Sequence, residues 1–268
     1  MKVSLVIPVY NEEKYLANCL DSVFAQDEKP DEVIVVDNNS LDNTVAIAKK
    51  YPVTILHEKK QGITPARNTG FNAAQYEIIA RTDADTILPK DWITRVKKTF
   101  AQNAKLVGLS GPAHYYHVPE FIQLHNWPNN FALNRTFRQA LKHDCLFGPN
   151  MAIRKIAWEQ IKDETCLNDA DVHEDVDLAI HIARLGEMKF DKTLIVESSP
   201  RRFQKLEPYF EYPYRFIKTL QKHEKSLLAL RANPQFIKKL VPKHATIKRL
   251  GKTSRELIKK YKDKYLVI

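Results

Sequence analysis

Two aspartates separated by one residue, Asp83 and Asp85, follow a short segment at residues 77–81 that is typical of a buried β-strand. Carboxylates at this spacing suit a hard divalent cation and leave coordination positions for phosphate oxygens. Aspartate is also common in turns, so the spacing alone does not decide between a metal site and a loop. The pair is a candidate Mg or Mn site that depends on its neighbours for support.

A second acidic pair, Glu174 and Asp175, opens a stretch at residues 172–185 whose apolar positions recur at helical spacing. A carboxylate placed there could take a proton from a hydroxyl as a general base. Acidic residues in the first turn of a helix also complement its dipole without any catalytic role. Both interpretations fit these residues taken alone.

Basic and imidazole side chains offer further chemistry near the same segments. Arg201 and Arg202 follow Pro200 and could bind a pyrophosphate by paired hydrogen bonds, or could belong to a solvated surface. His173 and His181 could add an imidazole ligand for a metal, although a lone histidine is more often structural.

Short β-branched runs alternate with helical patterns, which predicts an α/β fold with a mostly parallel sheet flanked by helices. We expect strands at residues 3–9, 33–36, 53–57, 77–81, 105–110 and 194–196, and helices at 12–24, 42–50, 64–74 and 172–185. Thr64 and Pro65 read as the N-cap and first residue of the third helix. Residues 111–147 show no clean period, and we interpret them as an irregular region beside the predicted site.

Ligands of open α/β sheets gather at the carboxyl ends of the strands. Residues 8–11, Asp37 and residues 83–85 each end a predicted strand, so we expect them to line one crevice.

Four motifs in order, at residues 6–13, 35–44, 62–70 and 83–85, together with the later Glu174-Asp175, resemble glycosyltransferase family 2. The resemblance runs from residue 3 to about 91 and resumes from about 148 to 202. It implies a GT-A type nucleotide-binding domain and sugar transfer from a nucleotide sugar with inversion.

The resemblance also implies roles by position. For the donor nucleotide, it implies that Pro8, Tyr10 and Glu12 line the pocket, that Asp37 accepts a hydrogen bond from the nucleobase, and that Arg67 lies near the phosphates. It implies that Asp83 and Asp85 bind the ribose and Mg²⁺ or Mn²⁺. It implies that Asp175 is the general base, with Glu174 as its alternate. Asn38-Asn39 departs from the commonest second motif, which leaves the donor base open, with a UDP-sugar favoured. Residues 148–152 resemble the loop that faces donor sugar and acceptor, or form only a turn before a strand.

The chain's 268 residues carry a net charge of +10, which is unevenly distributed. Residues 203–268 hold 17 Lys and Arg against 5 Asp and Glu, so this segment is +12 and residues 1–202 are −2. The sequence therefore predicts a catalytic domain at 1–202 and a basic amphipathic helical extension at 203–268. The extension could contact an anionic membrane, which would bring the catalytic domain to a saccharide or lipid-linked acceptor. Alternatively, it could pack on the catalytic domain or on another copy of the chain.

The sequence predicts a cytoplasmic protein, with peripheral contact at the inner face of the cell membrane as an option. Its three cysteines lack the spacing of metal ligands, and it shows neither a signal-peptide pattern nor an apolar run long enough to span a membrane. Polysaccharide, glycolipid or cell-envelope glycan synthesis fits such an enzyme. A nucleotidyltransferase would place a Gly-rich basic loop where Tyr10 to Glu13 lie. A nucleotide-binding scaffold without turnover remains the non-enzymatic alternative, and the confinement of the basic surplus to the extension argues against a nucleic-acid partner.

Overall fold

The computed structural model describes residues 1–116, 134–135, 138, 141–167, 172–201 and 207–223. Within these ranges the helices are α1 (Leu16–Phe24), α2 (Thr44–Ala48), α3 (Ile63–Ala73), α4 (Trp92–Gln102), α6 (Lys155–Ile161), α7 (Glu174–Ile182) and α8 (Glu207–Lys222). The strands are β1 (Val3–Val9), β2 (Glu32–Asp37), β3 (Thr54–His57), β4 (Ile78–Arg81), β5 (Thr86–Ile87), β6 (Leu106–Ser110), β7 (Ala113–Tyr115), β8 (Met151–Arg154), β9 (Glu187–Phe190) and β10 (Val196–Ser198).

The main sheet has seven strands in the order β3-β2-β1-β4-β8-β6-β9. The first four are parallel to one another, whereas β8 runs antiparallel to both β4 and β6. A second, three-stranded sheet in the order β5-β10-β7 carries the segment expected as a strand at 194–196, which starts two residues later than predicted. The predicted α/β class with a mostly parallel, helix-flanked sheet is confirmed.

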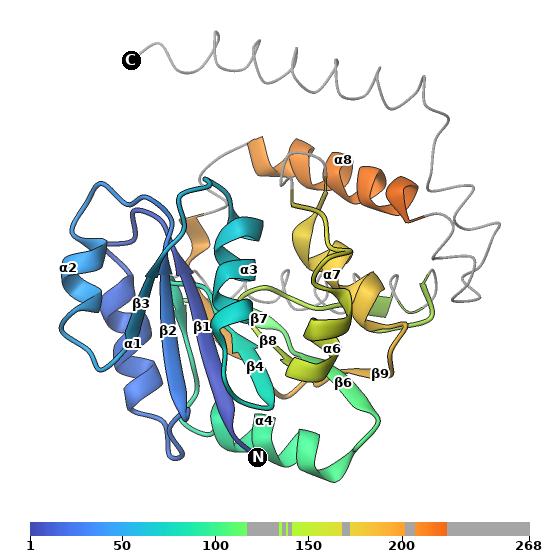
Figure 1. Ribbon diagram of the computed structural model, residues 1–268, viewed down its shortest axis with the longest axis horizontal. Coiled ribbons are helices and arrows are strands. Elements are labelled where there is room, and N and C mark those ends of the chain that lie inside the picture. The colour runs from blue at the N-terminus through green and yellow to red at the C-terminus, as the bar shows by residue number, and fades with distance from the viewer. Residues whose placement is uncertain (117–133, 136–137, 139–140, 168–171, 202–206, 224–268) are drawn as a thin grey trace, which may run out of the picture.

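Alternation along β1 explains why helices cover both faces of the sheet. Leu5 and Ile7 pack into one core cluster with α1 and α4, whereas Val6 packs into a second cluster with α3, α6 and α7. Figure 1 shows α3, α6 and α7 together along one side of the sheet, and α8 beyond the edge at which β1 ends. A parallel strand covered on both faces is expected to be largely apolar, as β1 is except for Ser4, whose buried hydroxyl donates to Glu32 Oε2 at 2.6 Å.

Two predicted helix starts are wrong for physical reasons. The third helix begins at Ile63, not after Thr64, because Gly62 adopts a φ of 142°, a conformation open to glycine, and turns the chain there. Glu12 and Glu13 precede α1 instead of forming its first turn, because residues 12–15 form a tighter turn in which the Glu12 carbonyl accepts the Tyr15 N–H at 3.0 Å as well as the Leu16 N–H at 2.9 Å.

The predicted basic extension falls largely outside the described residues, which end at 223. The division at residue 202 therefore stays a prediction. Among the described residues, no helix combines the length and the apolar character needed to cross a membrane.

Candidate active site

Asp37 is the last residue of β2 and pairs with Val9, the last residue of β1, so it lies beside the segment that follows β1. Asp37 is buried, and its Oδ1 accepts the Ser40 N–H at 3.1 Å while its Oδ2 lies 3.0 Å from His57 Nδ1. These contacts fix the orientation of a carboxylate at the edge where the sequence predicts the nucleotide base.

Asn38 has a structural role that accounts for its departure from the commonest motif. It is buried, and its Nδ2 donates to the carbonyls of Glu58 and Lys60, each at 2.8 Å. Its Oδ1 accepts the Gly62 N–H at 2.8 Å. One amide therefore pairs three backbone groups of the loop that leads into α3, a task that needs both a donor and an acceptor.

The aspartate pair lies between β4 and β5, and each carboxylate is paired with an arginine. Asp83 Oδ1 lies 3.0 Å from Arg81 Nη2, and Asp85 Oδ2 lies 2.8 Å from Arg201 Nε. Arg201 also donates two hydrogen bonds of 2.6 Å to Glu12, and its guanidinium lies 4.9 Å from the centre of the Tyr15 ring. Arg201 thus joins Glu12 to Asp85 by a bidentate ion pair and a second contact.

The electrostatics of this cluster suit a divalent cation. Burial raises the pKa of the Cys19 thiol, and the carboxylates of Asp85 and Asp83 raise it further. Burial also raises the pKa of Glu12, against the opposing effect of Arg201. Oxygen ligands under a negative local potential are what Mg²⁺ and Mn²⁺ prefer, so Asp83 and Asp85 fit the predicted metal.

Arg81, at the end of β4, is the residue that connects the two acidic pairs. Its Nη1 lies 2.6 Å from Glu174 Oε1 and 3.6 Å from Asp175 Oδ1, while its Nη2 contacts Asp83. The side chain is only 2% exposed. One guanidinium therefore contacts three carboxylates from two segments about ninety residues apart in the chain.

Glu174 and Asp175 differ in their pKa values although they are neighbours in sequence. Burial raises the pKa of Glu174, but the charges of Arg81 and Arg67 outweigh it and hold the pKa well below its usual range. Burial raises the pKa of Asp175, and the adjacent Glu174 carboxylate raises it further. Adjacent carboxyl groups whose pKa values are driven apart are typical of sites with an acid–base task, although structural ion pairs produce the same effect.

Arg67 lies on α3 and is fully buried. Its Nη1 donates to Glu174 Oε2 at 2.5 Å, and its Nε and Nη2 donate to Asn68 Oδ1 at 3.0 and 2.8 Å. These contacts occupy the guanidinium, so the geometry favours a positioning role for Arg67 over the phosphate contact that the resemblance implies.

The backbone at Gly148 approaches the two central side chains of the site. Its N–H donates to Asp175 Oδ2 at 2.9 Å. A Cβ at this position would lie 2.8 Å from Arg81 Nη2 and 3.2 Å from Asp175 Oδ1. The loop at residues 148–152 is therefore next to the candidate base, and it also leads into β8, so the two interpretations of this loop are compatible.

The remaining predicted residues are placed less centrally. Pro8 is buried in β1 opposite Val36, and Tyr10 is 46% exposed just after the strand. Arg202 lies outside the described residues. Arg81 was missed as a functional candidate, and the available signal was a charged residue ending a strand predicted to be buried.

Comparison with known proteins identifies the family. Residues 4–161 match the family described as Glycosyl transferase family 2. Glycosyltransferase GlyA of Streptococcus pneumoniae is 30% identical over 106 residues, which are 38% of this chain and 15% of GlyA. Glycosyltransferase AglE of Haloferax volcanii is 35% identical over 107 residues, which are 37% of this chain and 35% of AglE. The matched segments thus span well under two thirds of either relative.

Solved structures agree with the fold. S. aureus TarS in complex with UDP-GlcNAc gives a TM-score of 0.64 at 18% identity, covering 90% of this chain and 70% of that one. Mannosyltransferase PcManGT from Pyrobaculum calidifontis, in complex with GDP-Man and Mn²⁺, gives 0.63 at 22% identity, covering 90% and 68%. At these identities the likeness establishes the fold, which is of the expected GT-A type. Since the family match extends over more than half of the sequence, the chain belongs to glycosyl transferase family 2.

Proposed function

We propose that this protein is an inverting glycosyltransferase that moves a sugar from a nucleoside diphosphate sugar to an acceptor hydroxyl. The observation that carries the proposal is the arrangement around Arg81, whose guanidinium contacts both Asp83 of the strand-end pair and Asp175 of α7. A leaving-group site and a general base must lie close together for a single displacement.

In the proposed donor complex, Asp37 accepts a hydrogen bond from the base, and Pro8, Tyr10 and Glu12 line the nucleotide pocket. The complexes of the neighbouring structures, UDP-GlcNAc in TarS and GDP-Man in PcManGT, support a nucleotide sugar as donor class. The donor base stays open, with a UDP-sugar favoured. Arg201 is the proposed pyrophosphate ligand, and it must release at least one of its present carboxylate partners to bind there.

Asp83 and Asp85 would hold a Mg²⁺ or Mn²⁺ ion, which supplies charge neutralisation for the departing diphosphate when bound. The Mn²⁺ in the PcManGT complex supports this choice of metal. Asp175 takes the proton of the acceptor hydroxyl, and a raised pKa suits a group that must accept a proton in the transition state. The Gly148 N–H and Arg81 position that carboxylate, while Arg67 fixes Glu174 beside it.

A saccharide or lipid-linked acceptor in polysaccharide, glycolipid or cell-envelope glycan synthesis follows as a finer proposal. It rests on the basic segment at 203–268, most of which lies outside the described residues. A cytoplasmic protein that contacts the inner face of the membrane through this segment would float with anionic liposomes at low salt and stay behind with neutral ones. An equal distribution between the two would remove the membrane from the proposal.

The proposal is tested by measuring nucleoside diphosphate release from UDP-, GDP- and dTDP-sugars with Mn²⁺ or Mg²⁺. We expect one donor class to be turned over by the parent protein and by the exposed control Asp163→Asn, and we expect at least about a hundredfold loss in Asp85→Asn and Asp175→Asn. NMR of the product should show a β-linkage from an α-linked donor. Turnover that persists in Asp175→Asn, or a product with retained configuration, would contradict the proposed mechanism.

A further inference from the structure

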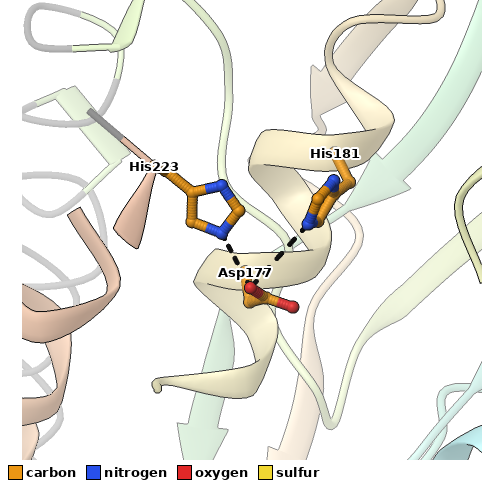
Figure 2. Close-up of side chains that lie close together, drawn as sticks. All are labelled: Asp177, His181 and His223. Carbon is orange, nitrogen blue, oxygen red and sulfur yellow. Dashed lines mark hydrogen bonds and ion pairs between the residues drawn. The ribbon is translucent and has the colours of Figure 1, made fainter. Parts of the chain in front are cut away.

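Three buried side chains away from the aspartate pair form a second cluster of metal-ligand type. Asp177 and His181 lie on α7, and His223 follows the last residue of α8. One ligand atom from each lies within 4.8 Å of the other two. Figure 2 shows both imidazole rings directed toward the Asp177 carboxylate, where the two dashed contacts meet on one oxygen.

We infer that Asp177, His181 and His223 form a zinc site, separate from the proposed Mg or Mn site, that joins α7 to the end of α8. The inference does not depend on the proposed function, because none of the three residues belongs to the donor site.

The spacing of the ligands fits a tetrahedral ion after a small adjustment. Asp177 Oδ1 lies 2.7 Å from His223 Nε2 and 3.9 Å from His181 Nε2. Metal–ligand distances near 2.0–2.2 Å place neighbouring tetrahedral ligand atoms about 3.3–3.6 Å apart. The two observed distances bracket that range. The imidazole rings meet edge to face with their centres 4.7 Å apart, and each contacts the Asp177 carboxylate through its Nε2 atom.

The ligand types favour zinc over the metals expected at Asp83 and Asp85. Two imidazole nitrogens and one carboxylate oxygen make a set that binds Zn²⁺ well, whereas Mg²⁺ and Mn²⁺ prefer oxygen. Three protein ligands leave the fourth zinc position for water.

Burial and protonation are also suited to a metal. The exposed fractions of Asp177, His181 and His223 are 2%, 5% and 7%. Burial lowers the pKa of His181 to about 4, so its ring is neutral at pH 7. Burial raises the pKa of Asp177, but the hydrogen bonds from His223 and the Cys166 N–H outweigh it and keep the carboxylate ionised.

His181 Nε2 carries the clearest sign of a missing partner. The atom is buried and makes no hydrogen bond. Its other ring nitrogen, Nδ1, lies 2.9 Å from Arg184 Nη2, which donates to it, so the proton of the neutral ring is on Nε2. A zinc ion on Nε2 would require the ring proton on Nδ1, where Glu164 Oε2 lies 3.4 Å away as an acceptor. Arg184, which now donates to Nδ1 and is ion-paired with Glu164, would then have to turn away from the ring. A carboxylate behind a ligating histidine is the usual outer partner at zinc sites.

Zinc at this position would stabilise the attachment of α8 to the helix that carries the candidate base. The two helices are already joined near the opposite end of α7, where the His173 N–H donates to Thr219 Oγ1 at 2.7 Å. The alternative to a metal is a hydrogen-bonded clamp in which His223 Nε2–H donates to Asp177.

The test measures zinc by mass spectrometry after dialysis of an Asp83→Asn/Asp85→Asn protein, in which the other site is disabled. We expect about one zinc per chain and a rise of about 5 °C in Tm on zinc addition. His223→Gln, which retains a donor toward Asp177, should lose most of the zinc at unchanged circular dichroism. His114→Gln, a histidine outside the cluster, should keep it.

Absence of bound zinc in the Asp83→Asn/Asp85→Asn protein, or full zinc in His223→Gln, would overturn the inference and leave the clamp. If His223→Gln does not fold, X-ray absorption of the zinc-loaded Asp83→Asn/Asp85→Asn protein decides. Imidazole nitrogens in a four-coordinate shell support the site, and an all-oxygen shell overturns it.

Discussion

Replacing Arg81 by glutamine should destabilise the protein severely because the guanidinium neutralises three carboxylates in a buried place. Arg81 is 2% exposed and lies 2.6 Å from Glu174 and 3.0 Å from Asp83. Each contact has a gross attraction on the order of 5 kcal/mol at an effective dielectric constant near 20, and desolvation offsets much of it. Removing one partner of such a pair leaves buried charge uncompensated and costs about 3–5 kcal/mol.

The loss should appear as a fall of roughly 10 °C in Tm at pH 7, measured by scanning calorimetry. Arg95→Gln is the control, because Arg95 is partly exposed, lies 3.4 Å from Asp191 and donates to the Thr193 carbonyl at 2.7 Å and to the Thr193 hydroxyl; it should lose at most about 2 kcal/mol.

The loss in free energy of unfolding caused by Arg81→Gln should also depend on pH. The pKa of Glu174 is lowered in the folded protein, so its ionic contacts stabilise the fold fully above the usual value of 4.5 and lose this effect as the pH falls toward the lowered pKa. Since the variant lacks the Arg81 contact, it should differ most from the parent above about pH 5 and less at lower pH. A loss of stability equal to that of Arg95→Gln, or one that does not shrink as the pH falls from about 5 to about 3, would refute this account of the site.

Three further substitutions test other contacts of the site. Asp175→Asn should abolish transfer but raise the free energy of unfolding at pH 7 by more than about 1 kcal/mol, because the raised pKa of Asp175 means that its ionisation opposes folding. Urea unfolding should show this gain in stability disappearing toward pH 4, and a loss of stability at pH 7 would contradict the prediction. Gly148→Ala should lower kcat by at least about tenfold, because its Cβ would lie 2.8 Å from Arg81 Nη2, and steady-state kinetics with unchanged rates would show that the loop adjusts. Arg201→Gln should weaken donor binding, but in the absence of donor it should strengthen Mn²⁺ binding about fivefold, because no guanidinium then contacts Asp85. Mn²⁺ titration followed by electron paramagnetic resonance checks the gain in Mn²⁺ affinity, and an unchanged affinity would contradict it.

The sequence was most informative where local pattern and burial agree. The apolar run at residues 5–9 of β1 and the polar residues that end β2 and β4 predicted a parallel sheet and its functional edge. The antiparallel course of β8 was not predictable, because a short buried strand has the same composition in either direction. Helix α4 was not among the expected elements, although Trp92 and Val96 lie at helical spacing and are buried.

The candidate site was predicted as a set of segments and not as a network. Sequence patterns gave Asp83 and Asp175 as separate candidates, whereas their connection through Arg81 depends on how α7 packs near the end of β4. The same limit applies to His181, which was considered as an extra ligand for the proposed site but lies with His223, a residue distant in sequence. Contacts between remote segments are set by tertiary packing, which no single-residue pattern encodes.

Isothermal titration of the donor in the presence of Mn²⁺ tests the central claim most directly, because it separates binding from chemistry. The account predicts that Asp175→Asn binds the donor within about threefold of the parent although it does not transfer sugar, whereas Asp85→Asn loses the metal-dependent part of donor binding. Donor binding lost equally in both variants, or kept with its metal dependence in Asp85→Asn, would contradict the assignment of the base to Asp175 and of the metal to the aspartate pair.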